Sequence, residues 1–181
     1  MHAGAAEHDD KRLAEMARTC ACGNFRKAAR SVTQAFDQGL SDTGLRSTQL
    51  VILITARLLG PSSIVCLARE LVMDRSTLTR NLKPLVAMGY LQLSKPASGK
   101  HKTVELTAEG HAALGRVIPA WQQCQTQLMS HFGAERWNRI MADLTEIVDA
   151  TRDGAVHAFH SAGRSRPLGR RSSPAPQRPR N

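Results

Sequence analysis

Residues 67–110, LARELVMDRSTLTRNLKPLVAMGYLQLSKPASGKHKTVELTAEG, place two short helical patterns, a polar turn and two β-like runs in immediate succession. Apolar residues recur every three or four positions on both sides of Asp74, which predicts one helix before this residue and a second helix that it caps. Gly89 stands where the second helix is expected to end. This order of patterns predicts a helix-turn-helix followed by a β-hairpin.

The second helix has two different sides. A step of 100° per residue places Leu78, Leu82 and Leu85 together, and polar or basic side chains opposite them. An arginine such as Arg80 can donate two hydrogen bonds to a guanine edge, and hydroxyl groups with the free N–H groups of a first turn can hold phosphate. An ordinary amphipathic helix with a solvated polar face is the alternative. We predict that the residues in contact with DNA are Arg75, Ser76, Thr77, Thr79, Arg80 and Lys83.

The hairpin has a basic tip. The two β-like runs, Tyr90–Ser94 and Thr103–Thr107, enclose the segment KPASGKHK, which has three lysines and no acidic residue. A basic hairpin directly after a helix-turn-helix is typical of a wing whose lysines lie near phosphate or in the minor groove. A solvated turn is the alternative. The lysines predicted to contact DNA are Lys95, Lys100 and Lys102.

The rest of the chain is predicted to be mostly helical. Apolar residues at spacings of three and four predict a long amphipathic helix over residues 10–38 and two further helices over about 108–152, with an interruption at Pro119. We therefore expect a mainly α fold with a small β-wing. It would combine a winged helix-turn-helix lobe at about 47–107 with a helical lobe built from the chain on either side.

The charge of the chain favours a polyanionic partner. The 181 residues carry a formal net charge of +10, and six arginines fall in the last eighteen positions, together with four prolines and no acidic residue. Such a segment cannot bury enough apolar surface to offset the entropy of ordering it. We expect a disordered basic tail at residues 153–181, which attracts phosphate without sequence preference, and a disordered N-terminus at residues 1–9.

Several classes of function are not supported by the sequence. No stretch is long and apolar enough to cross a bilayer, so we expect no membrane partner. Acidic residues stand near the start, where a secretory signal would need basic and apolar residues, so we expect a cytoplasmic protein. Its four cysteines are then expected to be thiols. We see no catalytic Ser/His/Asp order, phosphate loop or metal-ligand spacing, and expect no enzyme, no cofactor and no metal site. Cys20 and Cys22 could hold a soft metal such as zinc or copper, but no matching His or Cys cluster accompanies them.

Residues from about 12 to 152 resemble the MarR family of winged-helix transcription regulators. The resemblance rests on the order of elements and on the stretches LRSTQLVIL, LARELVMDRSTLTRNLKPLVAMGYL and LTAEGHAAL. It implies a homodimer, with dimerisation helices at about 10–38 and 108–152, that binds a pseudo-palindromic operator in double-stranded DNA. It also implies a repressor that responds to a small aromatic molecule. Family wings usually carry an Asp followed by an Arg at the tip, whereas this chain has Ser98, Gly99 and Lys100.

One branch of this family senses organic hydroperoxides, and the resemblance extends to its cysteines. An alignment without gaps puts Cys22 at the position of the reactive cysteine on the first helix of that branch, and Cys124 in the region of a second cysteine that forms a disulfide across the dimer. Arg26 and Arg18, one turn to either side, would favour a thiolate at Cys22. Arg26 and Phe36 replace tyrosines of that branch, and small packed cysteines are the alternative.

Two other functions stay open at this point. A peroxide-consuming thiol enzyme using Cys22 would share the same chemistry and would differ by turnover with a reductant. A sequence-tolerant DNA-binding protein driven by the basic tail would show steep salt dependence and little preference among sites. We expect a sequence-specific regulator that a small molecule or an oxidant releases from DNA.

Overall fold

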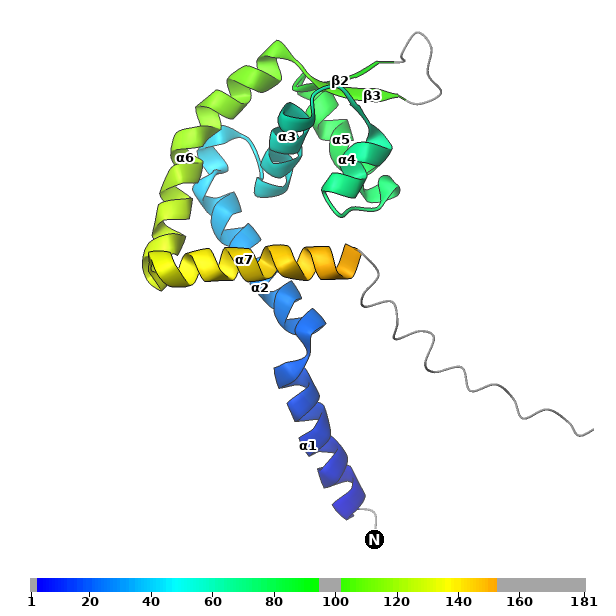
Figure 1. Ribbon diagram of the computed structural model, residues 1–181, viewed down its shortest axis with the longest axis vertical. Helices are drawn as coiled ribbons and strands as arrows, with labels where there is room; N and C mark the ends of the chain where they lie inside the picture. Colours follow the sequence, from blue (N-terminus) through cyan, green and yellow to red (C-terminus); the bar gives the residue numbers. More distant parts are fainter. Residues whose placement is uncertain (1–2, 95–101, 153–181) are drawn as a thin grey trace, which may run out of the picture. The chain divides into compact units, whose positions relative to one another are not determined.

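The computed structural model describes residues 3–94 and 102–152, with side chains from residue 9 onwards. The predicted tail at 153–181 and the wing-tip residues Lys95 and Lys100 lie outside the described residues. The predicted mainly α fold with a small sheet is confirmed. The elements in Figure 1 are α1 (Ala3–Thr19), α2 (Ala21–Gly39), the 3-10 turn η1 (Ser41–Thr43), α3 (Ser47–Leu59), β1 (Ser62–Ser63), α4 (Ile64–Glu70), α5 (Arg75–Ala87), β2 (Leu91–Ser94), β3 (Thr103–Leu106), α6 (Ala108–Phe132) and α7 (Ala134–Arg152).

The chain divides into two compact units. The first ends at Leu128, within α6, and the second begins at Met129. The second unit holds the end of α6 and the whole of α7, and its buried Trp137 lies with its ring centre 6.1 Å from that of Phe132.

The N-terminal segment forms two helices where the sequence predicts one. The sequence predicts disorder over residues 1–9, whereas the described part of this segment is helical, because α1 begins at Ala3. The expected single helix over residues 10–38 is also wrong, because the chain leaves the helical conformation at Cys20 and α2 starts after it. No proline occurs in this segment, and its one glycine, Gly23, lies three residues after the break, so the sequence does not mark Cys20 as a helix end.

Side chains stabilise the break between α1 and α2. Cys20 has an extended backbone and caps α2, because its Sγ accepts a hydrogen bond from the N–H of Gly23 at 3.4 Å. The amide nitrogen of Asn24 donates to the carbonyl oxygens of Arg18 at 2.9 Å and Cys20 at 3.0 Å. These bonds satisfy backbone groups that the end of one helix and the start of the next leave free.

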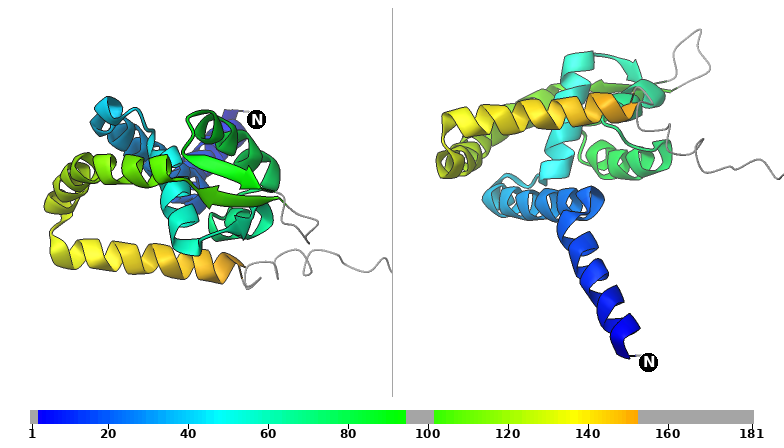
Figure 2. Two further views of the ribbon diagram at one scale, coloured as in Figure 1. Left: turned by 90° about the horizontal axis from the view of Figure 1, so that it is seen from above. Right: turned by 60° about the horizontal axis from the view of Figure 1, so that its bottom comes forward.

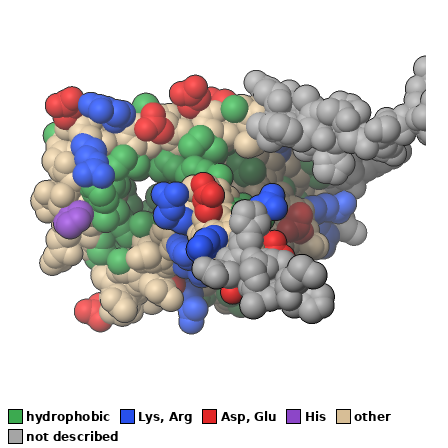
Figure 3. Space-filling model, turned by 90° about the horizontal axis from the view of Figure 1, so that it is seen from below, with side chains coloured by type: hydrophobic (Ala, Val, Ile, Leu, Met, Phe, Trp, Pro, Cys, Tyr) green, Lys and Arg blue, Asp and Glu red, His purple; other side chains and the backbone are tan. Residues whose placement is uncertain are grey.

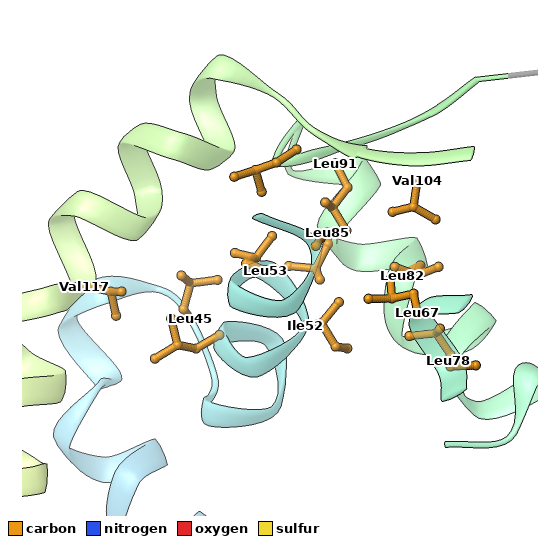
Figure 4. Close-up of a cluster of buried hydrophobic side chains, with 14 of the residues drawn as sticks. Leu45, Ile52, Leu53, Leu67, Leu78, Leu82, Leu85, Leu91, Val104 and Val117 are labelled. Atoms are coloured by element: carbon orange, nitrogen blue, oxygen red, sulfur yellow. The ribbon is translucent and has the colours of Figure 1, made fainter. Parts of the chain in front are cut away.

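Helices α3, α4 and α5 share one apolar core with the sheet. The predicted stripe of Leu78, Leu82 and Leu85 on α5 is buried. Figure 4 shows these side chains among those of Leu53 from α3 and Leu67 from α4, in the same buried cluster. Burying a leucine contributes about 1.5–3 kcal/mol, so three of them hold α5 firmly by one side.

The sheet has three strands in the order β1-β3-β2. The predicted runs Tyr90–Ser94 and Thr103–Thr107 are confirmed as β2 and β3, which pair antiparallel with Leu91 opposite Leu106. The left view in Figure 2 shows this hairpin beside α4 and α5. The third strand, Ser62–Ser63, was not predicted, since two serines carry no apolar alternation and pair through their backbone alone.

The predicted caps of α5 are present, and α4 is capped in a similar way. The Oγ of Ser63 accepts a hydrogen bond from the N–H of Cys66 at 3.1 Å, and so caps α4. The carboxylate of Asp74 accepts one from the N–H of Thr77 at 2.8 Å, and so caps α5. Gly89 follows α5 with a φ of 74°, in the left-handed region that glycine tolerates best.

Helix α6 continues through Pro119, so the predicted interruption there is wrong. Proline removes one backbone hydrogen bond and crowds the preceding turn, which disfavours a helix. Core contacts lie on both sides of it, however, because Val117 is buried and Ala120 packs against the core of the first unit. Tertiary packing therefore holds the helix together across the proline.

Gly110, in the first turn of α6, allows the helix to approach the hairpin closely. A Cβ atom built at this position would overlap the carbonyl oxygen of Tyr90 and would lie 2.8 Å from Cδ1 of Leu106. Gly115, one and a half turns further on, faces open space instead. Two glycines on the same helix therefore differ in whether a methyl group fits.

We predict opposite effects of the same substitution at these two glycines. Gly110→Ala should lower the free energy of unfolding by about 1–3 kcal/mol, because the backbone must shift to admit the methyl group. Gly115→Ala should raise it by about 0.5–1 kcal/mol, because alanine loses less backbone entropy in a helix. Urea unfolding at one protein concentration measures both, and a Gly110→Ala variant as stable as the wild type would contradict the packing described here.

Candidate nucleic-acid interface

The N-terminus of α5 is organised by Asp74. Its carboxylate accepts hydrogen bonds from the hydroxyl of Ser76 at 2.5 Å and from the N–H of Thr77 at 2.8 Å. Hydrogen bonds from Ser76 and then Thr77 hold the pKa of Asp74 well below its usual range, so the carboxylate is ionised at neutral pH. A negative charge is favourable at a helix N-terminus, but it repels a phosphate that approaches from the same side.

The outer face of α5 presents cations. Arg75, Arg80 and Lys83 are exposed, as are Ser76 and Thr79, whereas Thr77 is half-buried. Because the buried stripe occupies the opposite side of the helix from Arg80 and Lys83, these two cations point away from the core, whereas Arg75 is exposed because it lies in the first turn. The predicted exposure of this face is confirmed for all its residues except Thr77, while their contact with DNA stays a prediction.

The hydroxyl groups on α5 are already engaged within the helix. The hydroxyl of Thr79 donates to the carbonyl oxygen of Arg75 at 2.7 Å, and the Oγ1 of Thr77 accepts from Nη2 of Arg80 at 3.1 Å. With the bond from Ser76 to Asp74, each of the three hydroxyls therefore has a partner. The Thr77–Arg80 contact restrains the guanidinium, which keeps its other N–H groups available for a base edge or a phosphate.

The turn between α4 and α5 contains a strained residue. Val72 has a φ of 52°, the left-handed conformation that β-branched residues strongly avoid. The turn is nevertheless closed by backbone hydrogen bonds, from the N–H of Val72 to Arg69 at 3.2 Å and from the N–H of Met73 to Ala68 at 2.9 Å. A valine gives no turn signal, so sequence reasoning missed this position. It sets the direction in which α5 leaves the turn.

The wing is described at its base. Lys102 is exposed directly before β3, as expected for a residue near DNA, and Ser94 pairs with Thr103 at the last described step of the hairpin. Gln92 and Glu105 lie opposite each other, and the side-chain amide of Gln92 donates to the carboxylate of Glu105 at 2.9 Å. The wing thus carries an acidic residue on its strands as well as basic residues.

Thr107 joins the hairpin, the end of α5 and the start of α6. Its hydroxyl donates to the carbonyl oxygen of Gly89 at 2.6 Å and accepts from the N–H of Gly110 at 3.0 Å. Its N–H donates to the carbonyl oxygen of Tyr90 at 3.1 Å. The position of the wing relative to α5 therefore depends on one threonine. The sequence places Thr107 at the end of the second β-like run, beside the start of the next helix, and does not predict these hydrogen bonds.

The two cysteines predicted to sense oxidants do not meet within one chain. Cys22 is exposed in the first turn of α2, whereas Cys124 is partly buried and its Sγ packs against Gly39 at the other end of that helix. Seventeen residues of helix separate Cys22 from Gly39, which corresponds to about 26 Å. Arg26 lies one turn from Cys22, as predicted, but the break at Cys20 puts Arg18 on a different helix, so its predicted one-turn spacing is lost.

The described residues contain neither a metal-ion cluster nor a membrane-spanning helix. Within residues 3–94 and 102–152, no group of three or more His, Cys, Asp or Glu side chains is arranged to hold a metal ion. Over the same part of the chain, no helix combines the length and the apolar character needed to cross a membrane.

A cavity of about 320 Å³ lies beside the turn that leads into α5. Its wall is almost entirely apolar and comes from α2, α3, α6 and the turn itself, including Val32, Phe36, Val51, Met73 and Trp121. Because Met73 directly precedes the cap of α5, the cavity adjoins the start of the helix with the cationic face.

The chain is similar to known transcription regulators. It is 32% identical over 127 residues to the HTH-type transcriptional repressor NicR of Pseudomonas putida, which corresponds to 70% of this chain and 80% of NicR. No protein-family model matches the chain.

Solved structures resemble the fold over most of its length. A crystal structure of the M. tuberculosis transcriptional regulator MosR has a TM-score of 0.66 and 32% identity, covering 76% of this chain and 98% of MosR. The same regulator in complex with DNA has a TM-score of 0.64 and 36% identity over 74% of this chain and 98% of that one.

We predict that the strained turn can be relaxed by substitution. Val72→Gly should raise the free energy of unfolding by about 1 kcal/mol, because glycine adopts the left-handed conformation without the steric penalty that valine has there. Thermal or urea unfolding measures the change. Val65→Gly is the matched control, since Val65 is also exposed but lies in helix α4, where glycine should lower stability. A loss of stability in both variants would mean that Val72 is not strained.

Proposed function

Since the chain belongs to the MarR family of winged-helix transcription regulators, we propose that it is a sequence-specific repressor that binds operator DNA as a homodimer in the cytoplasm and is released by an effector. The similarity to the repressor NicR and to MosR, which was solved in complex with DNA, supports a DNA-binding transcription regulator. The observation that carries the finer proposal is the outer face of α5, where Arg80 is exposed and restrained while the opposite face is buried.

In this proposal α5 lies in the major groove. Arg80 donates to a guanine edge, and Arg75 and Lys83 reach phosphates on either side of it. Asp74 repels phosphate at the helix start, and Arg75 next to it offers the opposite charge. Lys102 contacts phosphate from the base of the wing, together with Lys95 and Lys100 at the tip.

We propose residues 47–107 as the DNA-binding lobe and the helices at 10–38 and 108–152 as the dimerisation lobe. The support is the apolar surface left open on those helices, which includes Leu13, Met16, Phe25 and Val32 in the first unit and, separately, Met141, Leu144 and Ile147 in the second. Hydrophobic side chains are visible on the face shown in Figure 3. Exposed apolar surface of this extent favours association with a second copy.

The 320 Å³ cavity is the proposed site of a small aromatic effector. A ring would pack against Trp121 and Phe36 and displace Met73, which is covalently continuous with Asp74 at the start of α5. A shift of α5 in each subunit would change the spacing of the two recognition helices. The operator would then no longer match both helices at once.

An organic hydroperoxide is the alternative effector. The thiolate of Cys22 would attack the O–O bond, giving a sulfenic acid and an alcohol, and a second thiol would then condense with the sulfenic acid to form a disulfide and water. The separation of about 26 Å along α2 rules out Cys124 of the same chain as that second thiol. Cys124 of the other copy is the proposed partner.

Two other functions, a thiol enzyme and a sequence-tolerant DNA-binding protein, can be distinguished from this one by assay. A thiol enzyme would turn over peroxide with a reductant, and a sequence-tolerant DNA-binding protein would bind random DNA as tightly as an operator. The relatives NicR and MosR are named as transcription regulators, so the similarity to them favours neither of these two functions.

Arg80→Ala is predicted to weaken operator binding by about 1–3 kcal/mol and to relax the base preference at one position in each half-site. Fluorescence anisotropy on an operator selected from random DNA measures both effects. Arg139→Ala, which removes an exposed arginine from α7, is the matched control and should bind like the wild type. Equal weakening on operator and random DNA would make Arg80 a phosphate contact and would contradict its proposed role.

Oxidation is predicted to release the wild type from its operator but to leave Cys22→Ser bound. The measurement is anisotropy with and without cumene hydroperoxide. Cys124→Ser should form the sulfenic acid at Cys22 but not the intersubunit disulfide. On non-reducing electrophoresis the oxidised variant should therefore run as a monomer, whereas the oxidised wild type should run as a covalent dimer. If Cys22→Ser is released like the wild type, the thiol mechanism is wrong and the aromatic effector remains.

A further inference from the structure

Helix α2 is joined to the rest of the first unit near its C-terminal end. None of its residues, all of which the structure describes, is buried, whereas Leu40 directly after it lies fully buried in the apolar core. At the same end, Gly39 lies so close to Sγ of Cys124 on α6 that a Cβ atom would overlap the sulfur. The direction of α2 relative to the core is therefore set by a few contacts near its end.

One of these contacts is polar and joins two helices. Oδ1 of Asp37, in the last turn of α2, accepts hydrogen bonds from the N–H and from the hydroxyl of Ser47, each at 2.7 Å. Ser47 is the first residue of α3, so its N–H has no acceptor within its own helix. Arg46, at the N-cap position, has no side-chain oxygen with which to cap the helix. Asp37 thus satisfies, from one helix, a donor at the start of the next.

The charge of Asp37 favours α3 over its own helix. A carboxylate in the last turn of a helix meets the negative end of the helix dipole, whereas a carboxylate beside the first turn meets the positive end. Hydrogen bonds from the Ser47 hydroxyl and then from its N–H lower the pKa of Asp37, against a smaller opposing effect of desolvation, so the carboxylate is ionised at neutral pH. Both bonds are therefore charge-assisted. Asp37 is unfavourable for α2 alone and favourable for the junction of α2 with α3.

We propose that Asp37 is a positioning residue, which fixes the angle between α2 and α3 through Ser47 and so sets the distance between the two recognition helices. This inference rests on the proposed function, in which α2 belongs to the dimerisation lobe. Helix α3 moves with α5, because Leu53 of α3 and Leu82 of α5 are buried in one cluster. The 19 residues of α2 span about 28 Å, so a tilt of about 5° at one end displaces the other by about 2 Å. That displacement approaches the rise of one base pair, about 3.4 Å.

The test measures operator affinity as a function of the spacing between half-sites. Fluorescence anisotropy compares the selected operator with versions that have one base pair inserted or removed between the half-sites. Wild-type protein should prefer the selected spacing at least about tenfold, because one base pair shifts a half-site by about 3.4 Å and turns it by about 36°. Asp37→Ala should reduce this preference to about threefold or less, because a loosened junction lets the two lobes follow the new spacing.

Three further variants separate position from charge. Asp37→Asn keeps an Oδ1 that can accept both hydrogen bonds, and should retain the spacing preference. Ser47→Ala removes the hydroxyl but keeps the N–H, and should show an intermediate preference. Asp42→Ala is the matched control and should bind like the wild type, because Asp42 is exposed and its carboxylate accepts a hydrogen bond from its neighbour Ser41, at 3.2 Å. Urea unfolding shows whether each variant is folded.

Two results would overturn the proposal. One is a wild-type spacing preference in folded Asp37→Ala, or in Ser47→Ala if Asp37→Ala does not fold. The other is an equal loss of preference in Asp37→Asn and Asp37→Ala, which would assign the effect to charge rather than to position. Failure of the proposed function gives a different result, because wild-type protein would then bind operator and random DNA alike before any variant is compared.

Discussion

Leu78, Leu82 and Leu85 are buried on one side of a 13-residue helix, and this burial constrains the rest of the first unit. Their combined contribution of several kcal/mol prevents α5 from rotating about its axis, so the side that carries Arg80 and Lys83 must face solvent. A helix held in this way presents the same side chains in every molecule. That is the requirement for reading a base sequence, because a direct readout fails if the helix turns by even one residue position.

Around this helix, a few polar contacts define its ends. Asp74 fixes the first turn and the Thr107 hydroxyl fixes the region after the last one, where it also ties the hairpin to α6. The turn before Asp74 is strained at Val72 and adjoins an apolar cavity through Met73. A rigid helix that is attached to a strained turn next to a cavity can change its direction without unfolding. This arrangement makes control by a ligand physically plausible in a way that a uniformly packed lobe would not.

Much of this architecture could be predicted from local chemistry. The apolar period of α5, the caps Ser63 and Asp74, and the alternation in β2 and β3 each depend on neighbouring residues, so the sequence displays them directly. The features that could not be predicted depend on contacts between distant residues or on backbone geometry. The break at Cys20 is stabilised by side-chain bonds that no helix-breaking residue announces, and Ser62–Ser63 becomes a strand only because β3 is beside it. The strain at Val72 and the role of Thr107 likewise depend on backbone geometry and on tertiary contacts.

The central claim is that two copies of α5 read two half-sites at once. The most direct measurement is hydroxyl-radical footprinting on an operator selected from random DNA, combined with sedimentation analysis of the complex. The account predicts two chains on each duplex and two protected half-sites centred about 34 Å, or one helical turn, apart. Protection of a single half-site by one chain, or protection spread along the duplex without sequence preference, would contradict it.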